Sequence, residues 1–307
     1  MKIVFMGTPE FAVPALEALI QSHHEVCAVF TQPDKPKGRG YQLTSPPVKE
    51  LACKHHIQVY QPETLKDGTA YRILQEIKPD VVIVVAYGKF LPLDILNLPK
   101  YGCINVHASL LPKYRGAGPI QWAILNGEKE TGVTTMYMAE GMDTGDIILK
   151  KELDILPDET AGELHDRLSV LGADVLMETL PLLENGSARR QKQEEAEVCY
   201  APQLTKEMSP IDFSKTAQQI HNQIRGLSPW PAAFVMIQGK RLKIYHSRLV
   251  PEIKGKAGQL LHEQRFIVGC GDGAAIEFTQ VQYEGSKRMD GAAFLRGRKL
   301  PLDTKLT

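Results

Sequence analysis

The stretch DVVIVVA, residues 80–86, has the pattern of a strand that is buried on both faces. Every residue after Asp80 is apolar, Pro79 precedes the stretch, and Gly88 follows it closely. An uninterrupted apolar run of this length, bounded by turn-forming residues, is typical of a central strand in a parallel sheet whose two faces are covered by helices. This segment therefore predicts an α/β fold.

The segments on both sides of this strand alternate between strand and helix patterns. We expect strands at 2–6, 25–30, 102–106 and 132–138, and helices at 11–20, 45–56 and 70–77. Such alternation implies right-handed crossovers and a doubly wound, mostly parallel sheet. Ligands of open α/β sheets bind beyond the carboxyl ends of the strands, so candidate site residues are sought there.

The pattern changes in the second half of the chain. A capping box, Thr160-x-x-Glu163, opens a long helix that is expected to end near Gly186. The polar residues 187–205 follow it without clear periodicity. We therefore expect an α/β domain over residues 1–186 and a linker over 187–205.

Residues 206–307 are expected to form a small β-barrel domain. An amphipathic helix is predicted first, and short strands separated by glycine-containing or polar turns follow it. The helix is expected at 214–227 and the strands at 233–237, 242–245, 258–261, 266–269 and 275–281.

The formal net charge of zero hides an asymmetry along the 307 residues. Residues 1–200 contain 20 Lys and Arg against 27 Asp and Glu, and residues 201–307 contain 16 against 9. A basic C-terminal region predicts contact with a polyanion such as a nucleic acid. Chance segregation of surface charge is the alternative.

Several classes of protein are disfavoured. No apolar stretch approaches the ~20 residues of a membrane-spanning helix. The five cysteines include no CxxC pair, which fits a reducing compartment and argues against disulfides or a zinc site. The sequence has no P-loop and no dinucleotide-binding glycine motif. The adjacent pairs His23–His24 and His55–His56 should point apart. We expect a cytoplasmic protein without metal or membrane partner.

The stretch NVHASLLPKYRGAGPIQ, residues 105–121, contains the first candidate site residues. Asn105 and His107 are two positions apart, so in a strand their side chains share one face at its carboxyl end. Two such donors aimed at one point can stabilise an oxygen that becomes negative in a transition state. A strand-end histidine with a purely structural hydrogen bond is the alternative reading of His107.

A second candidate motif is EGMDTGDIILK, residues 140–150. A carboxylate on this turn-rich loop could face His107 and hold it in its protonated form. It could equally cap a turn. The residues alone do not choose between Asp143 and Asp146.

These motifs resemble those of the folate-dependent formyltransferases. The resemblance is carried by NVHASLLPKYRGAGPIQ and GMDTGDIIL and extends along the chain through GTPEFAVPALEAL, VFTQPDKPKGRG, IVVAYGKFLP and SPWPAAF. It implies a Rossmann-like catalytic domain followed by an OB-like barrel, with 10-formyltetrahydrofolate as formyl donor. In the branch of the family that these segments resemble, the acceptor is the α-amino group of methionine on initiator tRNA.

The resemblance also implies roles for individual residues. Asn105 and His107 would polarise the formyl oxygen, and Asp143 would sustain the charge on His107 and help to move protons. Lys37 and Arg39 in the loop PDKPKGRGYQ would contact the tRNA. The folate site would comprise Tyr87, Gly88, Phe90, Leu91, Ser109, Leu110, Leu111 and Pro112. A monomer is expected.

Two alternatives remain at this point. A formyltransferase that acts on a small amine, such as glycinamide ribonucleotide or an amino sugar, would use the same Asn, His and Asp but has little need of a basic barrel. A non-catalytic module that binds tRNA or folate has little need of a histidine paired with a carboxylate.

Overall fold

The computed structural model describes residues 1–37, 42–298, 300–302 and 304–306. Contacts divide the chain into two compact units, each assembled from more than one segment. The first unit comprises Met1–Gly116, Gly132–Leu153 and His165–Tyr200, and the second comprises Ala117–Thr131, Asp154–Leu164 and Ala201–Thr307.

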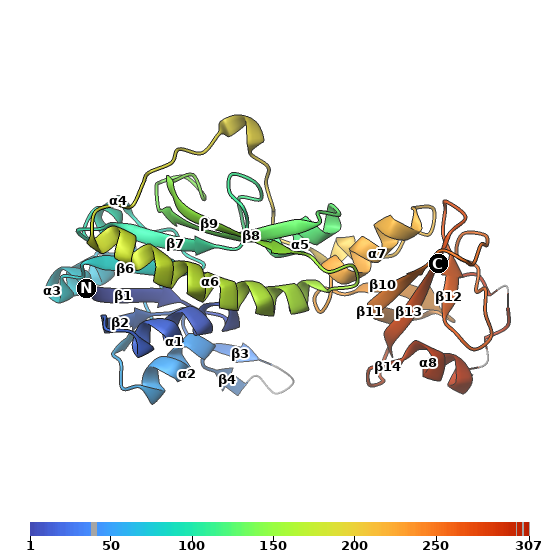
Figure 1. Ribbon diagram of the computed structural model, residues 1–307. Helices are drawn as coiled ribbons and strands as arrows, with labels where there is room; N and C mark the ends of the chain where they lie inside the picture. Colours follow the sequence, from blue (N-terminus) through green and yellow to red (C-terminus); the bar gives the residue numbers. More distant parts are fainter. Residues whose placement is uncertain (38–41, 299, 303, 307) are drawn as a thin grey trace. The chain divides into compact units, whose positions relative to one another are not determined.

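The first unit is built around a seven-stranded sheet (Figure 1). Its strand order is β5–β2–β1–β6–β7–β8–β9. The pairs from β5 to β7 are parallel, and β8 runs antiparallel to β7. The strands are β1 (Lys2–Gly7), β2 (Glu25–Phe30), β5 (Val59–Tyr60), β6 (Val81–Val85), β7 (Cys103–His107), β8 (Glu130–Tyr137) and β9 (Ile147–Asp154). The predicted mostly parallel α/β sheet is confirmed.

Strand β6 is the central apolar stretch from which the fold was predicted. All five of its residues are buried, with at most 4% exposure at Val84. Its side chains join a core cluster that includes Val4, Phe30 and Leu74. The burial fits a strand that is covered on both faces.

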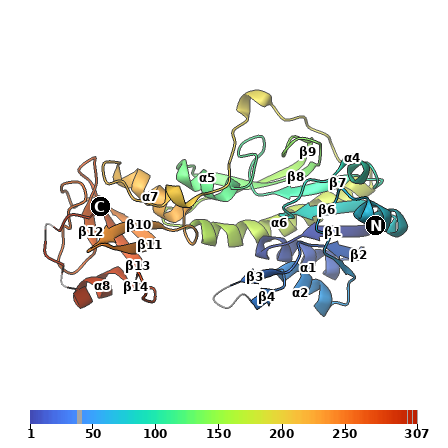
Figure 2. The ribbon, with the colours of Figure 1, turned by 180° about the vertical axis from the view of Figure 1, so that it is seen from behind.

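Helices connect the strands of the first unit, and Figure 2 shows them from behind. The helix α6 is opened by the predicted capping box, in which Thr160 N–H donates to Glu163 Oε2 at 2.8 Å and Glu163 N–H donates to Thr160 Oγ1 at 3.3 Å. Its bounds and those of the other elements are η1 (Glu10–Ala12), α1 (Val13–Gln21), α2 (Pro47–Lys54), α3 (Thr69–Ile77), α4 (Leu93–Leu96), α6 (Ala161–Glu184) and η2 (Glu195–Glu197), with a small hairpin of β3 (Lys35–Lys37) and β4 (Gln42–Thr44).

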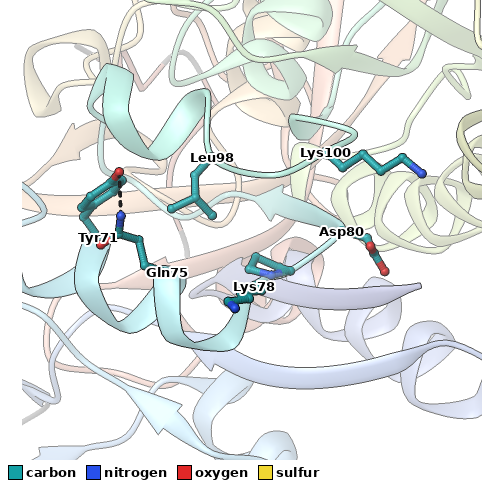
Figure 3. Close-up of a pocket in the computed structure, with 7 residues that line it drawn as sticks. Tyr71, Gln75, Lys78, Asp80, Leu98 and Lys100 are labelled. Atoms are coloured by element: carbon teal, nitrogen blue, oxygen red, sulfur yellow. Dashed lines mark hydrogen bonds between the residues drawn. The ribbon is translucent and has the colours of Figure 1, made fainter.

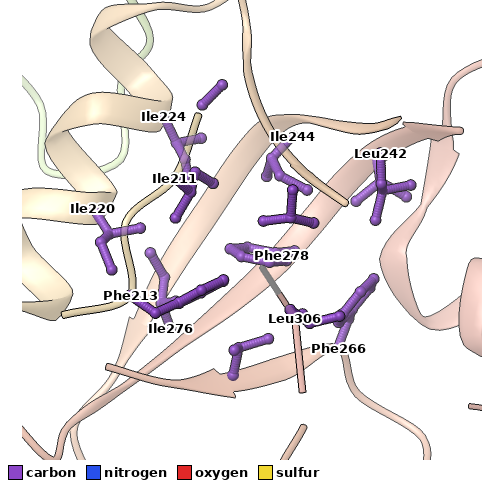
Figure 4. Close-up of a cluster of buried hydrophobic side chains, with 14 of the residues drawn as sticks. Ile211, Phe213, Ile220, Ile224, Leu242, Ile244, Phe266, Ile276, Phe278 and Leu306 are labelled. Carbon is purple, nitrogen blue, oxygen red and sulfur yellow. The ribbon is translucent and has the colours of Figure 1, made fainter. Parts of the chain in front are cut away.

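The second unit contains a curled antiparallel sheet with strand order β10–β11–β13–β12, and β14 pairs with β13. Figure 4 shows its core, where Ile220 and Ile224 of α7 face Phe278 of β13. The elements are α5 (Pro119–Leu125), η3 (Lys206–Met208), α7 (Ala217–Gly226), β10 (Ala233–Ile237), β11 (Lys240–Val250), β12 (Ile267–Gly269), β13 (Ala275–Tyr283), β14 (Met289–Asp290) and α8 (Gly291–Arg298). The small β domain is therefore present as a half-barrel.

The prediction of a strand at residues 258–261 in this domain is wrong. Gln259 and Leu260 form only isolated bridges, to Lys305 and Val268. Gly258 adopts φ +74, a left-handed conformation that turns the chain and interrupts the extended geometry a strand requires.

The two compact units are each made of several segments of the chain. Residues 117–131 and 154–164 belong to the second unit, although the sequence placed them within 1–186. Helix α5 packs against α7, and the Arg225 guanidinium donates to the carbonyls of Leu156 at 3.2 Å and Glu159 at 3.3 Å. These long-range contacts leave no pattern in the local sequence.

None of the helices in the described ranges combines the length and the apolar character that crossing a membrane requires.

Candidate functional site

Asn105 and His107 lie at the carboxyl end of β7. Asn105 is in register with Val84 of β6 and Met136 of β8, and His107 is opposite Thr134. The alternation of a strand places both side chains on one face, as predicted. His107 is 7% exposed and Asn105 is half-buried. Two polar groups therefore meet at the edge of the sheet where α/β proteins bind ligands.

The surroundings of His107 define which ring nitrogen is free. Nε2 lies 3.0 Å from the carbonyl oxygen of Tyr114, and since a carbonyl only accepts, Nε2 carries a hydrogen. Nδ1 lies 3.7 Å from Asp143 Oδ2, which is an ion-pair distance but too long for a hydrogen bond. Nδ1 is therefore the ring nitrogen that is available to an oxygen atom of a bound ligand, and it lies beside the Asp143 carboxylate.

Asp143, and not Asp146, is the carboxylate that faces His107. Asp143 Oδ2 also accepts the backbone N–H of Gly116 at 2.9 Å, and the residue adopts φ +53. Asp146 Oδ2 instead lies 3.9 Å from Arg190 Nε. The structure thus resolves the choice that the sequence left open.

The residues after His107 form a loop that is fixed by Thr134. The Thr134 hydroxyl donates to the Ser109 carbonyl at 2.7 Å and accepts the N–H of Leu111 at 3.1 Å. The Ser109 hydroxyl donates to the Lys113 carbonyl at 2.6 Å. This network fixes the backbone of residues 109–113, which leads to Tyr114, the residue whose carbonyl accepts from His107.

The expected folate residues of this loop differ in accessibility. Ser109 and Leu111 are both 0% exposed, and Leu111 packs against Met136 and Ile147. Pro112 is buried and Leu110 is half-buried. In this conformation a ligand can meet Ser109 and Leu111 only through neighbouring backbone.

The loop after β6 holds the other expected folate residues. Phe90 is 64% exposed and offers an open aromatic face, whereas Leu91 and Tyr87 pack in the core cluster of the sheet. The Tyr87 hydroxyl is buried without a partner, and burial raises the pKa of Tyr87 to about 12. Gln32 Nε2 donates to the carbonyls of Tyr87 at 3.1 Å and Gly88 at 3.3 Å, which fixes the loop backbone.

The sequence matches the models of a known protein family in both halves of the chain. A model of the formyl transferase family matches residues 1–180, and a model of the formyl transferase C-terminal domain matches residues 203–299. The chain belongs to the formyl transferase family.

Relatives within the family are similar over nearly their whole length. The chain is 51% identical over 302 residues to a methionyl-tRNA formyltransferase from Alkaliphilus oremlandii, covering 98% of this chain and 97% of that protein. It is 48% identical over 308 residues to the methionyl-tRNA formyltransferase of Geobacter sulfurreducens, covering 100% of this chain and 96% of the relative.

Solved structures share the fold. An N-formyltransferase from Helicobacter canadensis, in complex with folinic acid and dTDP-3-aminofucose, matches with a TM-score of 0.71 at 24% identity, covering 92% of this chain and 99% of that one. A methionyl-tRNA formyltransferase from Clostridium thermocellum matches with a TM-score of 0.57 at 20% identity, covering 95% and 100%.

Two cavities of this formyl transferase lie away from the site. One, of about 510 Å³, is lined by Tyr71, Gln75, Lys78, Pro79, Asp80, Leu98 and Lys100 (Figure 3). The other, of about 650 Å³, includes Tyr101, Gly102 and Cys103. The first adjoins the amino end of β6 and the second adjoins the amino end of β7, whereas open α/β sheets bind ligands at the carboxyl ends of the parallel strands. We therefore do not assign the reaction to either cavity.

Lys37 and Arg39 are the two residues expected to contact the tRNA. Arg39 and the side chain of Lys37 lie outside the residues that the structure describes.

The expectation that His23 and His24 point apart is wrong. Their ring centroids are 4.0 Å apart, and both rings face Glu184, with His23 Nε2 3.9 Å and His24 Nδ1 3.6 Å from its carboxylate. The Met1 amino group lies 3.3 Å from His24 Nδ1 and 3.5 Å from Glu184 Oε1. A metal ion among these three side chains would therefore lie next to the positively charged Met1 amino group, which already pairs with the Glu184 carboxylate.

Sequence reasoning missed Gln193. Its amide Nε2 donates to the carbonyl oxygens of Asp143 at 2.7 Å and Gly145 at 2.8 Å. Gln193 lies in the segment predicted to be a linker, 50 residues from Asp143. The segment is polar and aperiodic, so it carried no signal of this contact.

Proposed function

We propose that this formyl transferase moves the formyl group of 10-formyltetrahydrofolate to the α-amino group of methionine on initiator methionyl-tRNA. The observation that carries the proposal is that Asn105 and His107 share one face at the carboxyl end of β7 and that Asp143 Oδ2 lies 3.7 Å from His107 Nδ1. It is supported by identities of 51% and 48% to methionyl-tRNA formyltransferases over nearly the whole chain.

The reaction begins with attack of the neutral amine on the formyl carbon. The C=O electron pair moves onto oxygen, and a tetrahedral intermediate with a negative oxygen forms. The Asn105 amide and an N–H at His107 Nδ1 donate to this oxygen. Donors fixed before the reaction stabilise developing charge without reorganisation, and losing one typically costs about 10²–10³ in rate.

His107 is suited to carry positive charge in this step. Its Nε2–H already binds the Tyr114 carbonyl, and a proton on Nδ1 would lie beside the Asp143 carboxylate at 3.7 Å. The Asp143 carboxylate and the negative end of the Tyr114 carbonyl dipole therefore both face the ring. The imidazolium then gives a charge-assisted hydrogen bond to the oxyanion.

Collapse of the intermediate requires one proton to move. The attacking nitrogen loses a proton, which passes through water to the Asp143 carboxylate and then to N10 of the folate. The oxygen electron pair re-forms the C=O bond as the C–N10 bond breaks. The products are N-formylmethionyl-tRNA and tetrahydrofolate, so all atoms and charges balance. These residues supply the polarisation and the proton transfer, and we propose that the reaction uses no metal.

The folate is proposed to bind beside the loop after β6. The exposed Phe90 ring offers an apolar face to a planar heterocycle, and the backbone of Tyr87 and Gly88, fixed by Gln32, offers polar groups to its edge. Of the loop Ser109–Pro112, the half-buried Leu110 would contribute the contacts to the folate, because the other three residues are buried.

The tRNA is proposed to contact the basic C-terminal region and the loop that contains Lys37 and Arg39. Residues 201–307 hold 16 basic against 9 acidic residues, which suits a phosphate backbone. We further propose that the protein acts as a monomer in the cytoplasm.

The test is a formylation assay with full-length protein and 10-formyltetrahydrofolate. Initiator methionyl-tRNA is compared with free methionine and with a nucleotide-linked amino sugar. We expect efficient transfer only to the tRNA. Transfer to the amino sugar alone would make the protein a small-amine formyltransferase, and binding of folate and tRNA without transfer would make it a binding module. Either result contradicts the proposal.

A further inference from the structure

The segment from Gln191 to Tyr200 is attached at both ends to the first unit. Ile147 and Gln191 exchange backbone hydrogen bonds of 2.8 and 3.0 Å. At the other end, Arg115 N–H donates to the Cys199 carbonyl at 3.0 Å, and Tyr114 N–H donates to Cys199 Sγ at 3.2 Å. The predicted linker therefore begins as a strap across the loops that bear the candidate site.

Gln193 is the polar centre of this strap. Its two amide hydrogens go to the Asp143 and Gly145 carbonyls, and its Oε1 accepts Arg115 Nε at 3.0 Å. Both amide hydrogens and the amide oxygen are thus in use. Gln193 is half-buried although Lys192 and Glu194 beside it are exposed. Such a side chain connects the loop of Asp143 to the loop of Arg115.

The loop of Asp143 needs such support. Asp143 has φ +53, a left-handed conformation that is unfavourable for a residue with a Cβ atom. Its neighbour Gly145 lies so close to the Tyr137 carbonyl that an added Cβ would be 1.7 Å from the oxygen. The bonds to Gln193 and the Gly116 N–H hold the strained residue in place.

We propose that Gln193 is a positioning residue that fixes the Asp143 carboxylate against His107 Nδ1. The inference rests on the proposed function, because Asp143 is given its catalytic role there. Gln193 itself touches neither reactant. It acts by holding the backbone at Asp143 and at Gly145, two residues later, so its loss displaces Asp143 without removing any reacting group.

The substitution Gln193→Glu tests this with little change of shape. It keeps an oxygen for Arg115 but replaces the two donors by an acceptor that repels the Asp143 and Gly145 carbonyls. We expect kcat to fall about 10–100-fold, because small displacements of reacting groups cost up to about 10² in rate. The KM values for folate and tRNA should change less than about twofold.

A double-mutant cycle separates positioning from general damage. If Gln193 acts through Asp143, Gln193→Glu should lower kcat by no more than about twofold in an Asp143→Asn background. If it merely supports the fold, the two losses should multiply, and that result overturns the proposal. Gln193→Met, which removes all three bonds without adding charge, is the second variant should the first not fold.

Glu195→Gln is the matched control. Glu195 lies in the same segment and pairs with the same Arg115 at 3.0 Å, but its carboxylate is not a partner of the Asp143 loop. Its side chain is 77% exposed. We expect kcat within about twofold of wild type, because glutamine keeps a side-chain oxygen for Arg115 and the bonds of Gln193 to the Asp143 loop remain.

A measurement that does not depend on formyl transfer tests the role of Gln193 separately from the proposed function. The Gly116 amide donates to Asp143 Oδ2, so its hydrogen exchange, measured by NMR, reports the position of that carboxylate. Exchange should accelerate in Gln193→Glu. If wild type transfers no formyl group, the proposed function fails while this measurement still decides the role of Gln193. Unchanged Gly116 exchange, or unchanged kcat in an active enzyme, overturns the inference.

Discussion

Asp143 Oδ2 lies 3.7 Å from His107 Nδ1 and 2.9 Å from the Gly116 nitrogen, so one carboxylate oxygen faces both an imidazole and a backbone N–H. This relationship gives the loop after β8 a direct influence on a side chain of β7.

Replacing Asp143 by alanine should lower kcat by about 10²–10⁴, because both proton transfer and support of the His107 charge are lost. Asp146→Ala is the control on the same loop, since its carboxylate faces Arg190 instead. Steady-state formylation kinetics measure both. Near-normal turnover of the Asp143 variant would remove this residue from the mechanism.

Replacing His107 by alanine should lower kcat by a similar factor of about 10²–10⁴. Without the ring, the Tyr114 carbonyl and the Asp143 carboxylate each lose a partner, and this loss could destabilise the fold. Thermal unfolding of the same sample therefore checks that the variant is folded. A folded variant with wild-type turnover would mean that His107 is structural.

Asn105→Ala should also reduce kcat, and its effect should depend on His107. Since both side chains are proposed to act on one oxygen, the double variant should lose less than the product of the two single losses. Independent, multiplying effects would show that the two residues serve different steps.

Arg39→Ala should weaken the use of charged tRNA and leave folate affinity unchanged. If Arg39 neutralises one phosphate, the slope of log affinity against log salt should fall by about 0.7–0.9. Tyr41→Phe in the same loop retains the neighbouring cations and serves as control. An equal loss of folate affinity would assign the loop to the folate site.

Glu277 should make the second unit sensitive to acid. Arg265 donates to its carboxylate from Nε at 3.0 Å and Nη2 at 2.8 Å, and with Arg248 it lowers the pKa of Glu277 to about 2 against opposing burial. The folded pKa is below the unfolded one, so this stabilisation is full above about pH 4.5 and is lost as pH falls towards 2.

Chemical denaturation at two pH values measures this contribution. Glu277→Gln should cost about 1–3 kcal/mol at pH 5.5, and the difference from wild type should shrink at pH 3.5. Glu263→Gln, at an exposed position of the same unit, should change stability by less than about 0.5 kcal/mol. A pH-independent difference would rule out ionisation of Glu277 as its cause.

The sequence predicted features that depend on local pattern. The apolar run of β6 and the alternation around Asn105 and His107 follow from the periods of strands, and the Thr160–Glu163 cap spans a single turn. The strand at 147–154 was missed because its exposed and buried residues alternate weakly, and Gly258 was read as part of a strand although its positive φ ends one.

What the sequence could not predict depends on contacts between distant residues. Asp143 and Asp146 are equivalent in a turn-rich loop until the backbone places only one of them opposite His107. Gln193 resembles any polar residue of a linker, because its partners are Arg115 and the Asp143 loop, far away in the chain. The membership of α5 in the second unit likewise depends on α7, about 90 residues later in the chain.

The discontinuity of the second unit constrains the order in which the protein can fold during synthesis. Helix α5 leaves the ribosome long before α7, and at about 5–20 residues per second the delay is on the order of 5–20 s. Throughout this interval Trp122 and Leu125, which pack against the core that contains Ile220 and Ile224 of α7 in the finished structure, lack their final partners. The nascent chain therefore presents an apolar helix face to chaperones until synthesis has passed α7, and slowing translation between the two helices should lengthen that exposure.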